Sequence, residues 1–152
     1  MRHFARLALS CSLAMSATAA LALSPVINLA EVIQDRDWQL LAVDGTPLAA
    51  DVFATLRFAA DGQVSGQAPC NAFSTENRSA LPEISLGPIK ATKMACAALA
   101  EEVSFFNTLT QMQTAALGGE ATLILTGPDG HSLEFVLDRT DSTTTCKTCA
   151  AD

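Results

Sequence analysis

The sequence predicts an α+β fold: a small, curled, barrel-like antiparallel sheet with one helix inserted before its last two strands. Short segments of alternating or apolar character follow one another, and Gly-containing turn pairs separate them. A later segment, residues 95–113, lacks Gly and Pro and is rich in Ala, Leu, Glu and Met, which favour a helix. Two further alternating segments follow it. Strands joined by tight turns pair in antiparallel fashion, so this order is typical of a single α+β domain.

Composition and alternation predict the first strands. Residues 38–43 are rich in large apolar side chains and end at the turn pair Asp44-Gly45. Residues 54–59 alternate between apolar and polar side chains, and Asp61-Gly62 separates them from a second segment, residues 63–67. Two strands on either side of an Asp-Gly pair predict a β-hairpin.

The other strands are expected on both sides of the helix. Residues 74–80 and 84–89 are the weaker candidates before it, because the second is interrupted by a Gly-Pro pair. After the helix, Gly118-Gly119 is expected to form a turn. Strands at residues 122–126 and 132–137 then complete the domain.

The helical segment carries an apolar stripe. Its adjacent carboxylates, Glu101 and Glu102, diverge by about 100° around a helix. We therefore expect them to be solvated rather than to act as an acid–base pair. The residues expected to face the core recur at three- and four-residue steps: Leu99, Val103, Phe106, Leu109 and Met112.

The N-terminus has the three parts of a secretory signal peptide. Two arginines stand at the front, residues 7–23 carry no charge, and two A-x-A triplets follow the apolar core. We expect residues 1–22 to be the signal, with cleavage after Ala22 and with Ala19 as the second choice. Residues 23–35 are then a flexible lead-in to the domain.

Two other interpretations of the N-terminus are an uncleaved anchor and a lipoprotein. An anchor needs about 20 apolar residues, and Pro25 and Asn28 interrupt the apolar run. The lipidated residue would have to be Cys11, which lacks a large aliphatic residue three positions before it. We therefore expect a bacterial protein that is periplasmic or secreted and keeps no stable membrane span after signal cleavage.

Charge excludes one class of partner. The chain has 9 basic and 16 acidic residues, and loss of the signal removes two arginines and no acid, which leaves a net charge of −9. An acidic surface repels phosphates, so we expect no nucleic-acid partner. The single histidine of the mature chain, His131, lies beside a turn and does not suggest a catalytic triad. We expect no enzymatic activity, no cofactor and no metal site.

Four cysteines remain after signal cleavage, and an even number in an exported protein suggests disulfides. Of the three possible connectivities, we favour Cys70–Cys96 together with Cys146–Cys149. The second pair forms a C-x-x-C motif in the Thr-rich segment 139–152, which we expect to be disordered. A redox dithiol or half of a metal site is the alternative interpretation, although no helix can follow the motif and a second C-x-x-C is missing.

The first two cysteines lie in blocks that form a specific pattern with residues around them. The pattern consists of Trp38, Gly66, Cys70-Asn71-Ala72-Phe73 and Thr92-Lys93-Met94-Ala95-Cys96, followed by Glu102, Phe105 and Leu109. It resembles the META domain, also called the HslJ-like domain, over residues 36–138. The resemblance implies a small barrel-like sheet with a helix, a place in the bacterial envelope and a link to heat shock, but no defined reaction. Pro69 departs from the glycine that the family usually has before the Cys-Asn pair.

Within this pattern, most residues have a structural interpretation. We expect Asn71 to stabilise a turn, with contact to a ligand as the alternative. Thr92 could cap the helix, and Met94 is expected in the core. Trp38 is expected to pack across the sheet, with ligand stacking at a barrel mouth as the alternative.

The leading functional hypothesis is an exported, non-enzymatic META/HslJ-like protein that acts as a binding or stress-related module of the envelope or periplasm. Its partner would be an envelope protein or a small ligand. The alternatives are a thiol redox or metal-binding protein that uses Cys146 and Cys149, and an inhibitor of an envelope enzyme.

Overall fold

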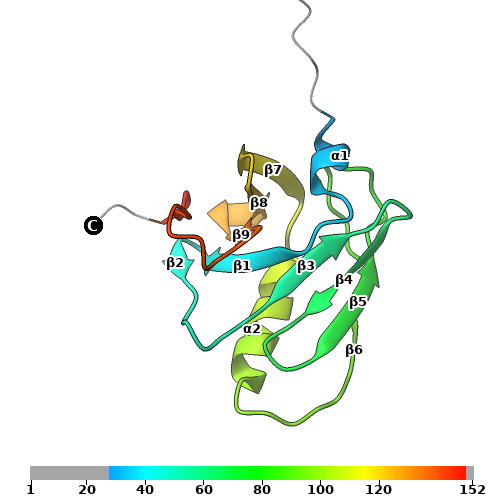
Figure 1. The fold of residues 1–152 in the computed structure, drawn as a ribbon. Coiled ribbons are helices and arrows are strands. Elements are labelled where there is room, and N and C mark those ends of the chain that lie inside the picture. Colours follow the sequence, from blue (N-terminus) through cyan, green and yellow to red (C-terminus); the bar gives the residue numbers. More distant parts are fainter. Residues whose placement is uncertain (1–27, 150–152) are drawn as a thin grey trace, which may run out of the picture.

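The computed structural model describes residues 28–149, and their fold is shown in Figure 1. Nine strands within these residues form one antiparallel sheet in the order β6-β5-β4-β3-β1-β9-β8-β7, with β2 paired to β1. The expected α+β class, a curled antiparallel sheet with a helix before the last strands, is confirmed. The elements are α1 (Leu29–Ile33), β1 (Trp38–Val43), β2 (Thr46–Pro47), β3 (Thr55–Phe58), β4 (Gln63–Gln67), β5 (Ala72–Glu76), β6 (Lys90–Ala91), α2 (Leu99–Leu109), β7 (Thr114–Gly119), β8 (Thr122–Thr126), the 3-10 turn η1 (Pro128–Gly130) and β9 (Ser132–Val136).

The sheet is curled but not closed into a barrel, because its end strands, β6 and β7, do not pair with each other. Strand β1 lies between its two halves, with β3 to β6 on one side and β9 to β7 on the other (Figure 1). The segment 82–84 approaches β7 instead: the Ile84 N–H donates to the Gln113 carbonyl at 2.7 Å, and the Ala115 N–H donates to the Pro82 carbonyl at 2.8 Å. These bonds satisfy backbone groups that an open edge would leave unpaired.

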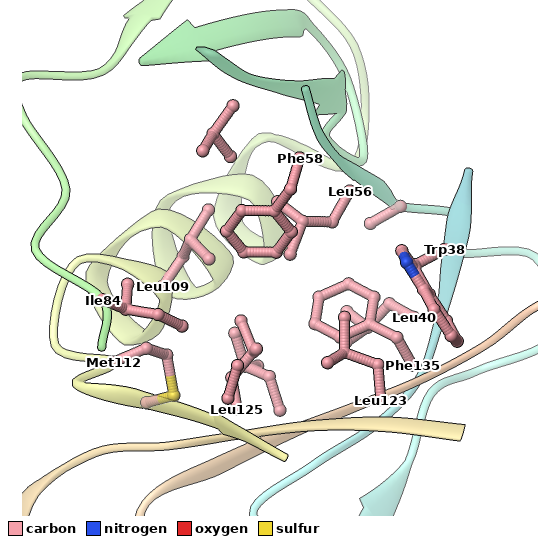
Figure 2. Packing of buried hydrophobic residues seen from close by; sticks show 14 of the residues in the cluster. Trp38, Leu40, Leu56, Phe58, Ile84, Leu109, Met112, Leu123, Leu125 and Phe135 are labelled. Carbon is pink, nitrogen blue, oxygen red and sulfur yellow. The ribbon is translucent and has the colours of Figure 1, made fainter. Parts of the chain in front are cut away.

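The concave side of the curled sheet holds the core. Side chains from β1, β3, β8 and β9 point toward one another there, and Phe105 and Leu109 of α2 join them. Figure 2 shows Trp38, Leu56 and Phe135 among these residues. Each fully buried large apolar side chain contributes about 1.5–3 kcal/mol, so this cluster supplies most of the driving force for folding.

Two predicted segments around the helix differ from the structure. Helix α2 spans Leu99–Leu109 rather than 95–113, and β7 begins at Thr114, where we expected a loop before the Gly118-Gly119 turn. Long-range bonds explain both differences. A disulfide and a hydrogen bond to Asn71 hold residues 94–96 outside the helix, and Gln113 uses its backbone groups in bonds to Thr126 and Ile84.

Two of the weaker strand predictions also shift. Strand β5 spans Ala72–Glu76 rather than 74–80, and residues 84–89 form one isolated bridge, between Asn77 and Leu86, before β6.

The predicted stripe of the helix is correct in its second half, where Leu109 and Met112 are buried and Phe106 packs against the core, and wrong in its first half. The buried residues of the helix are Glu102, Phe105 and Leu109, which also recur at three- and four-residue steps. Leu99 and Val103 are 41% and 58% exposed. The first turn is misplaced because a carboxylate, Glu102, occupies a core-facing position that a pattern of apolar residues does not detect.

The described part of the expected flexible lead-in forms α1. Asn28 caps this helix, since its side chain accepts a hydrogen bond from the Ala30 N–H. The Trp38 indole donates to the Ile33 carbonyl at 2.9 Å, so the helix is joined to the core. The predicted signal peptide, residues 1–22, lies outside the described residues. Between residues 28 and 149, no helix has the length and apolar character to cross a membrane.

Candidate functional site

The two cysteine blocks meet at a buried carboxylate. Glu102 of α2 is only 6% exposed. Its Oε2 accepts hydrogen bonds from the backbone N–H groups of Cys70 at 3.1 Å and Asn71 at 2.6 Å, and its Oε1 accepts from Asn71 Nδ2 at 2.8 Å. The expectation that Glu102 is solvated is therefore wrong. It pairs with polar groups of a loop distant in sequence, and this pairing makes its burial tolerable.

Asn71 extends these contacts to the second block. Its Oδ1 accepts hydrogen bonds from the Thr92 hydroxyl at 2.8 Å and the Met94 N–H at 2.7 Å. A disulfide joins Cys70 to Cys96 nearby. We call Cys70, Asn71, Thr92, Cys96 and Glu102 the brace, because they tie α2 and the strand before it to β5.

The geometry of the brace corrects two further expectations. Thr92 does not cap the helix, because its hydroxyl donates to Asn71 instead. Met94 is 61% exposed and lies outside the core, because only its backbone takes part in the brace. Ala95 is also exposed. No buried side-chain nitrogen or oxygen among the described residues lacks a hydrogen-bond partner. The Asn71 side chain therefore bonds within the protein, as its structural interpretation requires.

The remaining residues of the pattern build the core. Trp38 is fully buried and does not lie at a mouth of the sheet. Phe73 packs edge-on against Phe105 and Phe106, with ring centroids 5.9 and 5.4 Å apart. Gly66 faces the Thr55 carbonyl and the Phe73 ring at a distance that leaves no room for a Cβ.

An apolar cleft lies beside the brace. It has a volume of about 290 Å³ and runs between α2 and the chain from β1 to residue 52. Three exposed polar residues line it, namely Thr46, Glu101 and Ser104. Of its lining residues, Glu101 alone is ionisable. Its walls are formed by Leu40, Val43, Leu48, Val52, Pro69 and Phe105.

The character of this cleft suits a small apolar ligand. Sites for small molecules are concave and mostly apolar, with a few polar groups that fix orientation. A second hollow, about 460 Å³, lies over β4 and β5 and is polar, with Asp61, Glu76, Arg78 and Lys90 in its lining. Its charges have both signs and its walls offer little apolar surface, so the cleft is the better candidate.

The family model for the META domain matches residues 31–140 of this chain. The chain belongs to the META domain family. The expected resemblance is thereby confirmed, and the matched range contains the brace and the residues lining the cleft.

Solved structures share the fold of this META domain. An NMR structure of a protein from Burkholderia xenovorans is 24% identical, with a TM-score of 0.57, and the match covers 80% of this chain and 95% of that one. A crystal structure of a DUF4847 family protein from Bacteroides vulgatus ATCC 8482 is 14% identical, with a TM-score of 0.57, and covers 75% of this chain and 100% of that one. At such identities the likeness concerns the fold alone. No curated protein matches the chain.

The C-x-x-C motif lies beyond the residues that match the META domain. Cys146 and Cys149 are bonded to each other, so both disulfides of the favoured connectivity are present. Residues 28–149 contain no group of three or more His, Cys, Asp or Glu side chains placed to hold a metal ion.

His131 lies against the turn after β1. Its Nδ1 is 3.0 Å from Asp44 Oδ2, and Asp44 Oδ1 accepts a hydrogen bond from the Ser132 N–H at 2.8 Å. The backbone hydrogen bond from Ser132, followed by the hydrogen bond and charge of His131, lowers the pKa of Asp44 below its ordinary value. The pair joins the β1–β2 turn to the start of β9.

Proposed function

We propose that this META-domain protein is an exported, non-enzymatic binding module of the bacterial envelope, and that its ligand site is the cleft beside α2. The observation that carries the proposal is a wall of apolar side chains interrupted by a single carboxylate, Glu101. In contrast, the polar groups of the brace bond to one another.

The chemistry of the lining points to an amphipathic cation. An alkyl body would cover the apolar wall formed by residues such as Leu48 and Val52, and an ammonium or guanidinium end would face Glu101. The net charge of the chain, −7 over its full length, also favours a cation over an anion.

Octylammonium is the probe for this site, and octyl sulfate is its anionic counterpart. We expect saturable binding of octylammonium by calorimetry and weaker binding of octyl sulfate. Ser104→Trp should abolish binding because it fills the cleft from the exposed rim, and Glu101→Gln should remove the preference for the cation. Asn107→Trp is the matched control, since Asn107 is an exposed residue of α2 outside the cleft lining. Equal binding by the S104W and N107W variants would overturn the assignment of the cleft.

Export is tested separately. Two disulfides are compatible with an oxidising compartment such as the periplasm. We expect protein made with its own signal to have an intact mass that corresponds to a start at Leu23, with both pairs bonded. An uncleaved N-terminus with four free thiols would contradict export. A reaction catalysed by the purified domain and abolished by one side-chain substitution would contradict the non-enzymatic role.

A further inference from the structure

The segment after β9 packs onto the outer face of the sheet. We expected it to be disordered, but its described part, residues 139–149, makes specific contacts, and we call this part the strap. Arg139 donates to the Val52 carbonyl at 2.9 Å, and the Thr144 hydroxyl donates to the Asp138 carbonyl at 2.8 Å. Figure 1 shows the strap, in red, returning toward β2.

The strap covers a second buried carboxylate. Glu134 of β9 is 0% exposed, although it alternates with the core residues Leu133 and Phe135 and so points away from the core. Its Oε1 and Oε2 accept from the Lys147 N–H at 2.7 and 2.9 Å, and its Oε2 accepts from the Thr148 N–H at 2.7 Å. Every hydrogen bond that the structure gives this carboxylate comes from the strap.

A close backbone approach fixes the position of the strap. Gly45 has a φ of +73°, and a Cβ at this position would lie 2.8 Å from the Thr148 carbonyl oxygen. Ala42, which pairs with Glu134 across β1 and β9, is fully buried as well. The contact surface therefore combines a carboxylate, a small apolar residue and a glycine.

The Cys146–Cys149 disulfide encloses the two residues whose N–H groups reach Glu134. The Cys149 N–H also donates to Cys146 Sγ at 3.1 Å, and Cys146 Sγ lies 3.5 Å from Glu134 Oε2. A closed ring of four residues limits the backbone freedom of Lys147 and Thr148, which keeps both donors pointed the same way. Cys146 and Cys149 are themselves half-buried, so a reductant can approach their sulfurs.

From these contacts we propose that Cys146–Cys149 is a thiol–disulfide exchange site that controls whether the strap stays on Glu134. Its co-substrate is a dithiol. One thiolate of the dithiol attacks a cysteine sulfur, the S–S bond breaks and a mixed disulfide forms. The second thiol of the dithiol then attacks the dithiol's own sulfur in the mixed disulfide and releases the protein cysteine. The dithiol is thereby oxidised to a disulfide. Its two electrons and two protons pass to Cys146 and Cys149, which become thiols. Without the disulfide, the Lys147 and Thr148 N–H groups are no longer kept pointing at Glu134. The strap then detaches and Glu134 is exposed.

Linkage makes the proposal quantitative. If oxidation of the cysteine pair raises the equilibrium constant for docking of the strap on Glu134, docking must favour the oxidised over the reduced pair by the same factor. Removal of the Glu134 carboxylate should therefore make the pair easier to reduce. Neither effect involves the apolar cleft, so the inference does not depend on the proposed ligand.

The first test uses amide hydrogen exchange on the folded protein. We expect the Cys146→Ser/Cys149→Ser variant to lose protection at the Lys147 and Thr148 amides by roughly tenfold or more, while β8 amides keep theirs. Retained protection at these two amides would overturn the proposal.

The second test titrates the protein with dithiothreitol and follows each cysteine pair by differential alkylation and peptide mass. We expect Glu134→Ala and the milder Glu134→Gln to shift the Cys146–Cys149 midpoint toward reduction by roughly threefold or more, with Cys70–Cys96 unchanged. Glu120→Ala is the matched control, because Glu120 is exposed in the β7–β8 turn. If the Glu134 variants show the wild-type midpoint while β8 protection shows that they fold, the proposal is wrong.

Discussion

Glu102 accepts a 2.6 Å hydrogen bond from the Asn71 N–H and a 2.8 Å bond from Asn71 Nδ2, so one carboxylate on α2 satisfies both the backbone and the side chain of a residue 31 positions earlier. The family pattern places Cys-Asn before the helix and Glu on it, and this pair of bonds gives that pattern a physical reason. The polar residues of the pattern hold the helix on the sheet, because their hydrogen bonds are made to one another.

The first prediction concerns this carboxylate. Glu102→Ala leaves the Cys70 N–H, the Asn71 N–H and Asn71 Nδ2 buried without their acceptor. We expect the free energy of unfolding to fall by about 3 kcal/mol or more, measured by urea denaturation. Glu101→Ala is the adjacent control and should change stability by less than about 0.5 kcal/mol, because Glu101 is exposed. Similar values for the two variants would show that the brace does not stabilise the fold.

The second prediction concerns Gly66. Its position has no space for a Cβ, because the Thr55 carbonyl and the Phe73 ring face it directly. Gly66→Ala must push β4 away from β3 or move the Phe73 ring, and we expect a loss of about 2–3 kcal/mol in the free energy of unfolding. Ser65→Ala on the same strand is the control, with an effect below about 1 kcal/mol. A stable G66A protein with unchanged Phe73 ring shifts in NMR spectra would refute the packing described above.

The third prediction compares the two disulfides. Cys70 and Cys96 are 26 positions apart, so their bond restricts the unfolded chain far more than the bond of Cys146 and Cys149, which are 3 apart. On the chain-entropy model, Cys70→Ser/Cys96→Ser should lower the free energy of unfolding by about 3–4 kcal/mol, and Cys146→Ser/Cys149→Ser by about 1–2 kcal/mol. Thermal and urea unfolding of both variants measure the difference. A larger loss for the second variant would contradict the assignment of the first disulfide to the core domain.

The fourth prediction concerns pH. The pKa of Asp44 is lowered from 3.8, first by the backbone hydrogen bond from Ser132 and then by His131. Because the unfolded state then binds a proton more readily than the folded state, the carboxylate stabilises the fold above about pH 4 and this stabilisation is lost as the pH falls further. Carboxyl NMR titration should place the pKa of Asp44 below the ordinary aspartate value of 3.8, and Asp44→Asn should weaken the dependence of stability on pH in this range. An Asp44 titration at the ordinary value would contradict the contact with Ser132.

Strands with a strong local signal could be predicted from sequence. The bounds of β1, β4 and β8 match the segments expected from apolar content and Asp-Gly turns. Strand β7 could not, because its residues are mostly small and do not alternate between apolar and polar, with Gly118-Gly119 at its end. It becomes a strand through its pairing with β8.

The candidate site was less predictable than the fold. Burial of Glu102 and Glu134 depends on backbone N–H groups from segments distant in sequence, and no hydrophobic period reveals such partners. A signal for Glu102 did exist, since it precedes Phe105 and Leu109 at the same spacing that defines the buried face of α2. The cleft has no sequence motif, because its walls come from β1, the following loop, Pro69 and α2.

The most direct test of the account is to map amide chemical-shift changes while octylammonium is added to the oxidised protein. We predict saturable shifts grouped at the rim and wall of the cleft, at Thr46, Val52 and Ser104, and their loss in the S104W variant. Shifts grouped instead around Arg78 and Lys90 in the polar hollow, or no saturable shifts at all, would contradict the proposal that this cleft is the ligand site.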